Sequence, residues 1–259
     1  MKNFLKISVL LFVVLFTISC QKEITNETPE RSLLILVKDK SSSISQSNAE
    51  KQMEIKHLTR YLNQNLLENT DVVVMDINSH SDSRTNSTWF EYKAPKVIEN
   101  NRVQSKTQQE LEQTRYQTKV RKILKATKKK IINQMYSSAT SSNQTAIVEL
   151  LHPISEILKK YDKASICVYS DLIQESNFRD FTKAKWAMPS KTYATDLAKT
   201  DFERLQQQSY KIELSKVTSI DVVTPNKPEN EQYYIIMPYY WDMLLSLGNY
   251  NGKINWQKL

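Results

Sequence analysis

Glycine is nearly absent from this chain of 259 residues and occurs only as Gly248 and Gly252. A phosphate-binding loop needs several closely spaced glycines, because the backbone must turn sharply and approach the phosphate closely. Two glycines near the C-terminal end do not supply such a loop. The sequence therefore excludes P-loop and dinucleotide-binding chemistry of the usual kind.

Histidine and cysteine are also scarce, which bounds the possible chemistry. The three histidines, His57, His80 and His152, lie far apart, without the spacing of a metal site or a suitable nucleophile beside them. There is no G-x-S-x-G motif. The two cysteines are Cys20 and Cys167, and Cys167 lies in an apolar run typical of a core residue. We therefore expect no enzyme activity.

The first residues have the layout of a secretory signal. Lys2 and Lys6 precede an apolar run over residues 7–16, which is short for a membrane span, and small residues follow. The residues TISC that end at Cys20 resemble the lipobox of a bacterial lipoprotein. This resemblance implies a signal peptide over 1–19 and a lipidated Cys20. An ordinary cleaved signal and an uncleaved anchor helix are the alternatives.

Residues 20–31 are polar and are interpreted as a lipidated cysteine followed by a tether. Lipoprotein retention in the inner membrane is associated with aspartate at the position of Gln21, so the resemblance implies the outer membrane. Lipidation of Cys20 leaves Cys167 without a disulfide partner. The net charge of +8, which loses two units with Lys2 and Lys6, favours anionic neighbours without requiring nucleic acid.

Apolar runs alternate with long helical patterns over residues 32–259. This alternation predicts an α/β domain with a doubly wound, mostly parallel sheet and helices on both faces. Strands are expected at 33–38, 71–79, 165–171 and 217–225, an antiparallel edge strand at 88–95, and another edge strand at 252–257. Helices are expected at 47–67, 104–136, 145–161, 195–208 and 229–247, the last with a kink or late start at Pro238 and a stop at Gly248. The segment 81–138 is interpreted as an inserted or elaborated region.

Oxygen-bearing side chains cluster after two of these strands. The first strand ends on Asp39, which Ser41 and Ser43 follow, and the strand over 165–171 ends on Asp171. In an open α/β sheet, ligands bind at the carboxyl ends of the strands. Hydroxyl and carboxylate oxygens, without histidine or cysteine, favour a hard cation such as Mg²⁺ or Mn²⁺.

The pattern D-x-S-x-S after the first strand resembles the metal-ion-dependent adhesion site of von Willebrand factor type A domains. Thr145, before a later helix, and Asp171 stand where that family has its remaining ligands. The resemblance implies that Ser41, Ser43 and Thr145 contact the cation directly, and that Asp39 and Asp171 often act through water. It also implies a protein partner that offers an acidic side chain.

Two features weigh against this interpretation. Gln144 and Leu172 stand at positions where the family often has glycine. Helix capping also explains the same side chains without a metal. The residues concerned are Ser43 with Gln46 and Ser47 with Glu50 as capping boxes, Asp39 as an N-cap, and Thr145 as a first-turn residue.

We therefore predict a membrane-anchored envelope lipoprotein whose type A-like domain binds a protein partner through a divalent cation. One alternative is an interaction module with a vestigial metal site that binds through 81–138. A second is an envelope hydrolase that uses the same crevice.

The stretch KVRKILKATKKK carries seven cations on one expected amphipathic helix: Lys119, Arg121, Lys122, Lys125, Lys128, Lys129 and Lys130. A solvated basic face opposite a core stripe is the simplest interpretation. The functional alternative is contact with anionic headgroups, lipopolysaccharide phosphates or nucleic acid. Because an exported lipoprotein seldom meets nucleic acid, membrane contact is favoured among these and no nucleic-acid partner is expected.

Overall fold

The computed structural model describes residues 30–41, 47–95, 105–137, 142–183, 188–225 and 231–259. The predictions for the signal, for Cys20 and for Ser43 lie outside these residues. A compact unit runs from Arg31 to Leu259. In the part of the chain that is described, no helix is both long and apolar enough to cross a membrane.

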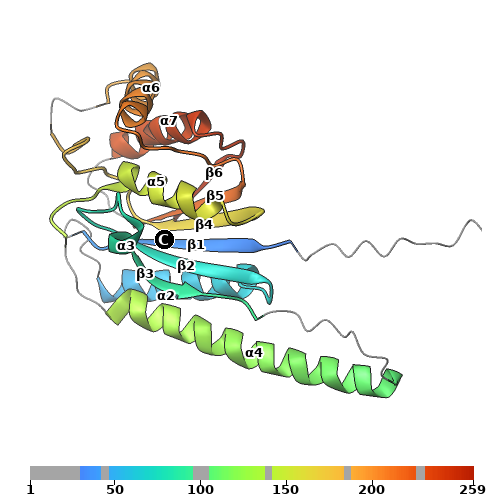
Figure 1. The fold of residues 1–259 in the computed structure, drawn as a ribbon. Coiled ribbons are helices and arrows are strands. Elements are labelled where there is room, and N and C mark those ends of the chain that lie inside the picture. Colours follow the sequence, from blue (N-terminus) through green and yellow to red (C-terminus); the bar gives the residue numbers. More distant parts are fainter. Residues whose placement is uncertain (1–29, 42–46, 96–104, 138–141, 184–187, 226–230) are drawn as a thin grey trace, which may run out of the picture. The chain divides into compact units, whose positions relative to one another are not determined.

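Six strands form one sheet in the order β3-β2-β1-β4-β5-β6 (Figure 1). They are β1 (Ser32–Asp39), β2 (Thr70–Ile77), β3 (Thr88–Tyr92), β4 (Lys163–Tyr169), β5 (Val217–Thr224) and β6 (Ile254–Lys258). All neighbouring pairs are parallel except β2 with β3, which are antiparallel. The mostly parallel sheet with an antiparallel edge strand is therefore confirmed, and strand bounds agree with the predictions to within a few residues.

The helices are α2 (Asn48–Asn65), α3 (Arg84–Ser87), α4 (Lys106–Ser137), α5 (Ile147–Leu158), α6 (Lys191–Gln207) and α7 (Glu231–Leu247). The short α3 was not predicted. Helix α6 begins earlier than predicted because Ser190 caps it, its hydroxyl accepting from Tyr193 N. A late start at Pro238 is wrong, since that residue lies inside α7. The stop at Gly248 is confirmed.

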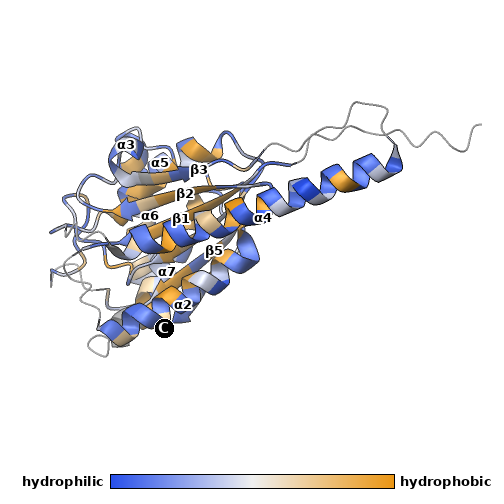
Figure 2. Cartoon of the chain, turned by 90° about the horizontal axis from the view of Figure 1, so that it is seen from below, coloured by the Kyte–Doolittle hydropathy of each residue, from blue (hydrophilic) through white to orange (hydrophobic). Residues whose placement is uncertain are grey.

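Strand β1 is buried on both faces and divides the core into two clusters. Leu33, Ile35 and Val37 pack with residues of α5, α6 and α7, whereas Leu34 and Leu36 pack with residues of α2 and α4. Figure 2 shows α2 and α4 side by side over the sheet. Each fully buried aliphatic side chain contributes about 1.5–3 kcal/mol. Because every residue of both clusters follows Arg31, residues 31–259 carry their own core.

An ion pair of Arg179 and Asp201 lies inside the layer formed by α6 and α7. The side chains are 4% and 0% exposed. Arg179 Nε donates to Asp201 Oδ2 at 2.8 Å, and the hydroxyl of Tyr240 on α7 donates to the same oxygen at 2.9 Å. This pair joins the segment after β4 to both helices, and loss of one partner leaves the other charge buried without compensation.

We expect Asp201→Ala to lower the free energy of unfolding by about 3–5 kcal/mol, because the Arg179 guanidinium then lacks its carboxylate. Urea denaturation of residues 31–259 measures this. Asp196→Ala is the matched control on the same helix, since the Asp196 carboxylate is 63% exposed in its pair with Lys199. It should change stability by no more than about 0.5 kcal/mol. Equal losses in the two variants would contradict the interpretation.

Candidate metal centre

Asp39, the last residue of β1, is 2% exposed. Its Oδ1 accepts a hydrogen bond from the backbone N–H of Ser41 at 2.8 Å. Its Oδ2 accepts one from the hydroxyl of Ser170 at 2.7 Å. Because Ser170 directly follows β4, these two bonds fix the carboxylate between the carboxyl ends of two neighbouring strands. Both oxygens keep further lone pairs that can accept.

The electrostatics of this carboxylate favour a cation. Burial raises the pKa of Asp39, and the hydrogen bonds from Ser170 and Ser41 partly oppose the rise. The neighbouring Lys38 forms its ion pair with Glu54 of α2. Among the described residues, no ion pair joins Asp39 to a lysine or arginine. A buried carboxylate of this kind is stabilised when a positive charge binds beside it.

Thr145 lies at the same edge, in the loop before α5, and is 1% exposed. Its N–H donates to Glu175 O at 2.9 Å, and Glu175 N donates to Thr145 O at 2.9 Å. The first-turn interpretation of Thr145 is wrong, because α5 begins at Ile147 and this reciprocal pairing holds Thr145 outside the helix. In the same loop, Ser142 N donates to Lys40 O at 3.3 Å, which places the loop beside Ser41.

Asp171 follows Ser170 and is 2% exposed. One carboxylate oxygen accepts from Ile173 N at 3.1 Å. The intervening Leu172 has a φ of 55°, in the left-handed region that favours glycine. Its side chain is buried and its carbonyl accepts from Trp241 Nε1 at 3.2 Å. Leucine at this position therefore keeps a glycine-like backbone, at a cost of about 1–3 kcal/mol.

The structure brings Asp39, Ser41, Thr145 and Asp171 to the carboxyl ends of β1 and β4, whereas Ser43 is outside the described residues. No group of three histidine, cysteine or acidic side chains suited to a metal occurs in the described ranges. A cation here depends on hydroxyl oxygens together with two carboxylates, a donor set that fits Mg²⁺ or Mn²⁺.

The capping alternative is confirmed for Ser47 alone. Ser47 is the N-cap of α2 and forms a capping box with Glu50. Asp39 ends β1 and is not a helix cap, so that interpretation is wrong. The pairing of Ser43 with Gln46 lies outside the described residues. The structure thus removes the capping explanation from Asp39 and Thr145.

Gln174, which the sequence analysis missed, orders this edge of the sheet. It is fully buried, and its Oε1 accepts from Ile147 N at 2.7 Å and Val148 N at 2.9 Å. These bonds satisfy the start of α5, where the N-cap, Ala146, has no side-chain acceptor. Gln174 Nε2 donates to Glu149 Oε2 at 2.7 Å. No local pattern could have revealed these bonds to α5, because their partners lie 25 to 27 residues earlier in the sequence.

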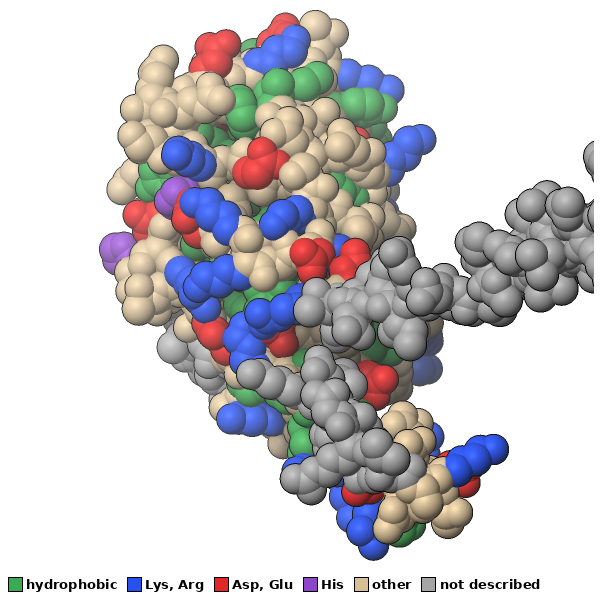
Figure 3. All heavy atoms as spheres, turned by 45° about the vertical axis from the view of Figure 1, so that its right-hand side comes forward, with side chains coloured by type: hydrophobic (Ala, Val, Ile, Leu, Met, Phe, Trp, Pro, Cys, Tyr) green, Lys and Arg blue, Asp and Glu red, His purple; other side chains and the backbone are tan. Residues whose placement is uncertain are grey.

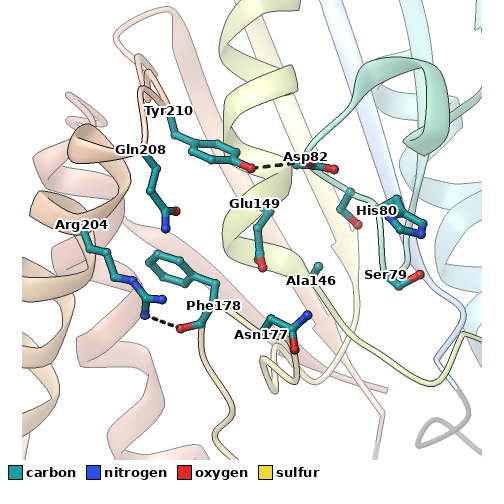
Figure 4. Close-up of a pocket in the computed structure, with 11 residues that line it drawn as sticks. Ser79, His80, Asp82, Ala146, Glu149, Asn177, Phe178, Arg204, Gln208 and Tyr210 are labelled. Atoms are coloured by element: carbon teal, nitrogen blue, oxygen red, sulfur yellow. Dashed lines mark hydrogen bonds between the residues drawn. The ribbon is translucent and has the colours of Figure 1, made fainter.

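A pocket of about 270 Å³ adjoins the centre, since Ala146, the neighbour of Thr145, lines it. Figure 4 shows side chains that converge on it from the loop after β2, from α5 and from α6. The Tyr210 hydroxyl donates to Asp82 Oδ2 at 3.3 Å, and Arg204 Nη1 donates to Phe178 O at 2.8 Å. Both signs of charge therefore line the pocket.

Comparisons with known proteins give structural likeness alone. No family profile matches the chain, and no curated protein matches it. It is similar to the VWA domain of SpRpn10, with 10% identity, a TM-score of 0.37, and coverage of 89% of this chain and 88% of that one. It is also similar to the ArnB paralog VWA2 from Sulfolobus acidocaldarius, with 10% identity, a TM-score of 0.40, and coverage of 88% and 41%.

A third similar structure is the pilus adhesin SpaC from Lactobacillus rhamnosus GG in its open conformation. The identity is 11%, the TM-score is 0.46, and the coverage is 90% of this chain and 28% of that chain. This chain therefore spans less than half of the adhesin and of the Sulfolobus protein. At these identities and TM-scores, the likenesses carry no argument about family membership or function.

The raised pKa of Glu149, which lines this pocket, predicts how the free energy of unfolding changes with pH. Burial raises the pKa, hydrogen bonds from Ser176 and Gln174 partly oppose the rise, and the charge of Asp82 adds to it. A carboxyl with a raised pKa binds more protons in the folded chain than in the unfolded one. Its contribution to the free energy of unfolding is therefore lost as pH rises from about 4.3, the unfolded value, through the folded pKa.

We expect Glu149→Gln to make stability less dependent on pH over this window, which urea denaturation of residues 31–259 at stepped pH measures. Glu156→Gln is the control on the same helix, because the hydrogen bond from Lys159 lowers the pKa of Glu156 and gives a slope of opposite sign. A Glu149→Gln profile parallel to that of the native chain would refute the prediction.

Proposed function

We propose that this chain is a lipid-anchored envelope protein whose domain binds a protein partner through Mg²⁺ or Mn²⁺. The observation that carries the proposal is the convergence of four buried oxygen-bearing side chains at the carboxyl end of the sheet. They are Asp39, Ser41, Thr145 and Asp171. Two of them are carboxylates, and Asp39 forms no ion pair with a basic side chain among the described residues.

The roles of the ligands follow from their chemistry. Ser41, Ser43 and Thr145 offer neutral hydroxyl oxygens to the cation, while Asp39 and Asp171 supply the negative charge, in part through water. A cation held this sparsely keeps an open coordination position. A carboxylate of the partner fills that position, because a divalent cation attracts an anionic oxygen more strongly than water does.

The pocket beside the centre supports an extended contact with the partner. Arg204 and Asn177 line it, and Ala146 links it to the Thr145 loop. A partner segment that places its acidic side chain at the cation lies next to these groups. Polar side chains beside that acidic residue are therefore the expected determinants of partner choice.

The two alternatives differ in where they place the contact. In a module with a vestigial metal site, binding uses the region 81–138, which contains α3, β3 and α4. A hydrolase would use the crevice itself. Asp76 lies one residue before the end of β2, and His80 lies in the loop that follows it. Asp76 Oδ2 is engaged in an ion pair with Lys40 Nζ at 2.9 Å, whereas the carboxylate of a catalytic triad accepts from a histidine. We favour binding over hydrolysis for this reason.

Cation binding should stabilise residues 31–259 against heat. At a hundredfold excess over Kd, a ligand of the folded state adds about 2.7 kcal/mol to the free energy of unfolding. That corresponds to a rise in Tm of about 5–10 °C for a domain of this size. We expect this rise when Mg²⁺ or Mn²⁺ replaces EDTA, and its loss in Asp39→Asn and in Thr145→Val.

The behaviour in EDTA separates loss of a ligand from loss of the fold. Asp39→Asn removes a desolvated charge, so its Tm in EDTA should not fall substantially. Asp76→Asn is the matched control, because this carboxylate also lies near the edge but pairs with Lys40. It should keep the cation-induced rise. If neither cation raises the Tm of the native sequence, the metal site is vestigial and the first alternative replaces this proposal.

Lipidation is tested on the full chain, expressed in a bacterium that exports lipoproteins and is fed labelled palmitate. We expect label in the native chain and none in Cys20→Ala. Cys167→Ala is the matched control, because Cys167 is buried in the core and inaccessible to acylation. It should keep the label. Label that persists in Cys20→Ala, or is absent from the native chain, would exclude the anchor.

A further inference from the structure

A groove of about 470 Å³ runs between α2 and α4, on the face of the sheet opposite α5. Its apolar part is formed by Leu124 and Ile132, which are half-buried against the core cluster beneath them. Four cations of α4 also line the groove: Arg121, Lys125, Lys128 and Lys129. The groove is therefore amphipathic, with aliphatic side chains flanked by positive charge.

The phase of α4 explains this arrangement. Val120, Ile131 and Met135 lie on the stripe that faces the sheet and are nearly fully buried. Arg121, Lys125 and Lys128 recur at spacings of four and three residues, so they form the neighbouring stripe. Lys125 and Arg121 are exposed. Helix α4 thus packs on the sheet through its apolar stripe and exposes the neighbouring basic stripe to solvent.

The charge of the groove has little internal compensation. None of the ion pairs among the described residues involves Arg121, Lys125, Lys128 or Lys129. The Lys128 ammonium donates to a neutral partner, Asn63 Oδ1, at 3.0 Å. A merely solvated helix face more often mixes charges of both signs. The concentration of one sign points to an anionic ligand.

We propose that the α2–α4 face binds the surface of an anionic phospholipid bilayer. The four cations attract the phosphates, and Leu124 and Ile132 meet the apolar boundary below the headgroups. Single-stranded nucleic acid fits the groove less well, because single strands are held by stacking on aromatic rings and these apolar side chains are aliphatic. A phospholipid surface matches both features of the groove, because it has negatively charged phosphates above an apolar boundary.

The direction of α4 agrees with contact between the α2–α4 face and a membrane. Figure 1 shows the start of α4 projecting at the same end of the sheet as the start of β1. The fourteen residues before Val120 extend about 21 Å along the helix. The proposed anchor at Cys20 precedes Arg31 by eleven residues, a separation of at most about 40 Å along an extended chain. Figure 3 shows side chains of both signs at the projecting end, so the one-sign cluster lies further along α4.

The test is sedimentation of residues 31–259, which lack the proposed anchor, with vesicles in EDTA, so that neither the lipid nor the metal centre contributes. We expect binding to vesicles of phosphatidylglycerol and phosphatidylcholine in equal parts, and none to phosphatidylcholine alone. Each basic residue near an anionic surface contributes about a fivefold factor in binding. The variant with Arg121, Lys125, Lys128 and Lys129 all changed to Gln should therefore bind at least about tenfold more weakly.

A matched variant separates local binding from net charge. Changing Lys183, Lys199, Lys211 and Lys253 to Gln removes the same charge from exposed positions outside α2 and α4, and should retain binding. Replacing the three groove lysines by Arg keeps the charge and should also retain it. Unchanged urea denaturation shows that each variant is folded. The proposal is overturned if the native sequence does not sediment with the anionic vesicles, if both Gln variants lose binding equally, or if it binds nucleic acid but not these vesicles.

Discussion

Burial of the Asp39 carboxylate is the constraint on which the carboxyl edge of the sheet depends. Because β1 is central and covered on both faces, the residue that ends it is removed from water as well. Ser170 and the N–H of Ser41 satisfy its oxygens but provide no opposite charge. Asp171 follows Ser170 in the chain, and the loop that carries Thr145 is joined to Lys40 through the N–H of Ser142. Desolvated oxygens at this end of the sheet are the reason that we propose a divalent cation there.

Lys38 and Asp39, the last two residues of β1, are both buried and charged, but different contacts stabilise their charges. Lys38 turns to the α2 face, where its ammonium pairs with the carboxylate of Glu54. Both side chains are nearly excluded from solvent, and the pair joins β1 to α2. Asp39, one residue later, has hydrogen bonds in place of an ion pair with a basic side chain. The Lys38–Glu54 pair therefore holds β1 to α2, whereas Asp39 is the charge that we propose binds a cation.

The sequence predicts the features that depend on neighbouring residues, and misses those that join distant ones. The strands and the acidic ends of β1 and β4 follow from apolar runs broken by Asp39 and Asp171. Gln174 and the buried ion pair of Arg179 with Asp201 could not be predicted, because their partners meet only after the helices pack. At Leu172, the residue type and the backbone conformation disagree. Its residue type departs from the glycine pattern, but tertiary contacts impose the glycine-like backbone.

The two proposed contacts use opposite sides of the sheet and so do not compete. The basic groove lies between α2 and α4, whose apolar residues pack on one face of β1. The pocket beside the metal centre is lined by residues of α5 and α6, which belong to the other face. A membrane bound along α2 and α4 therefore leaves the pocket accessible, with the cation edge between the two. The same buried strand that divides the core also separates the face proposed to meet lipid from the face proposed to meet a partner.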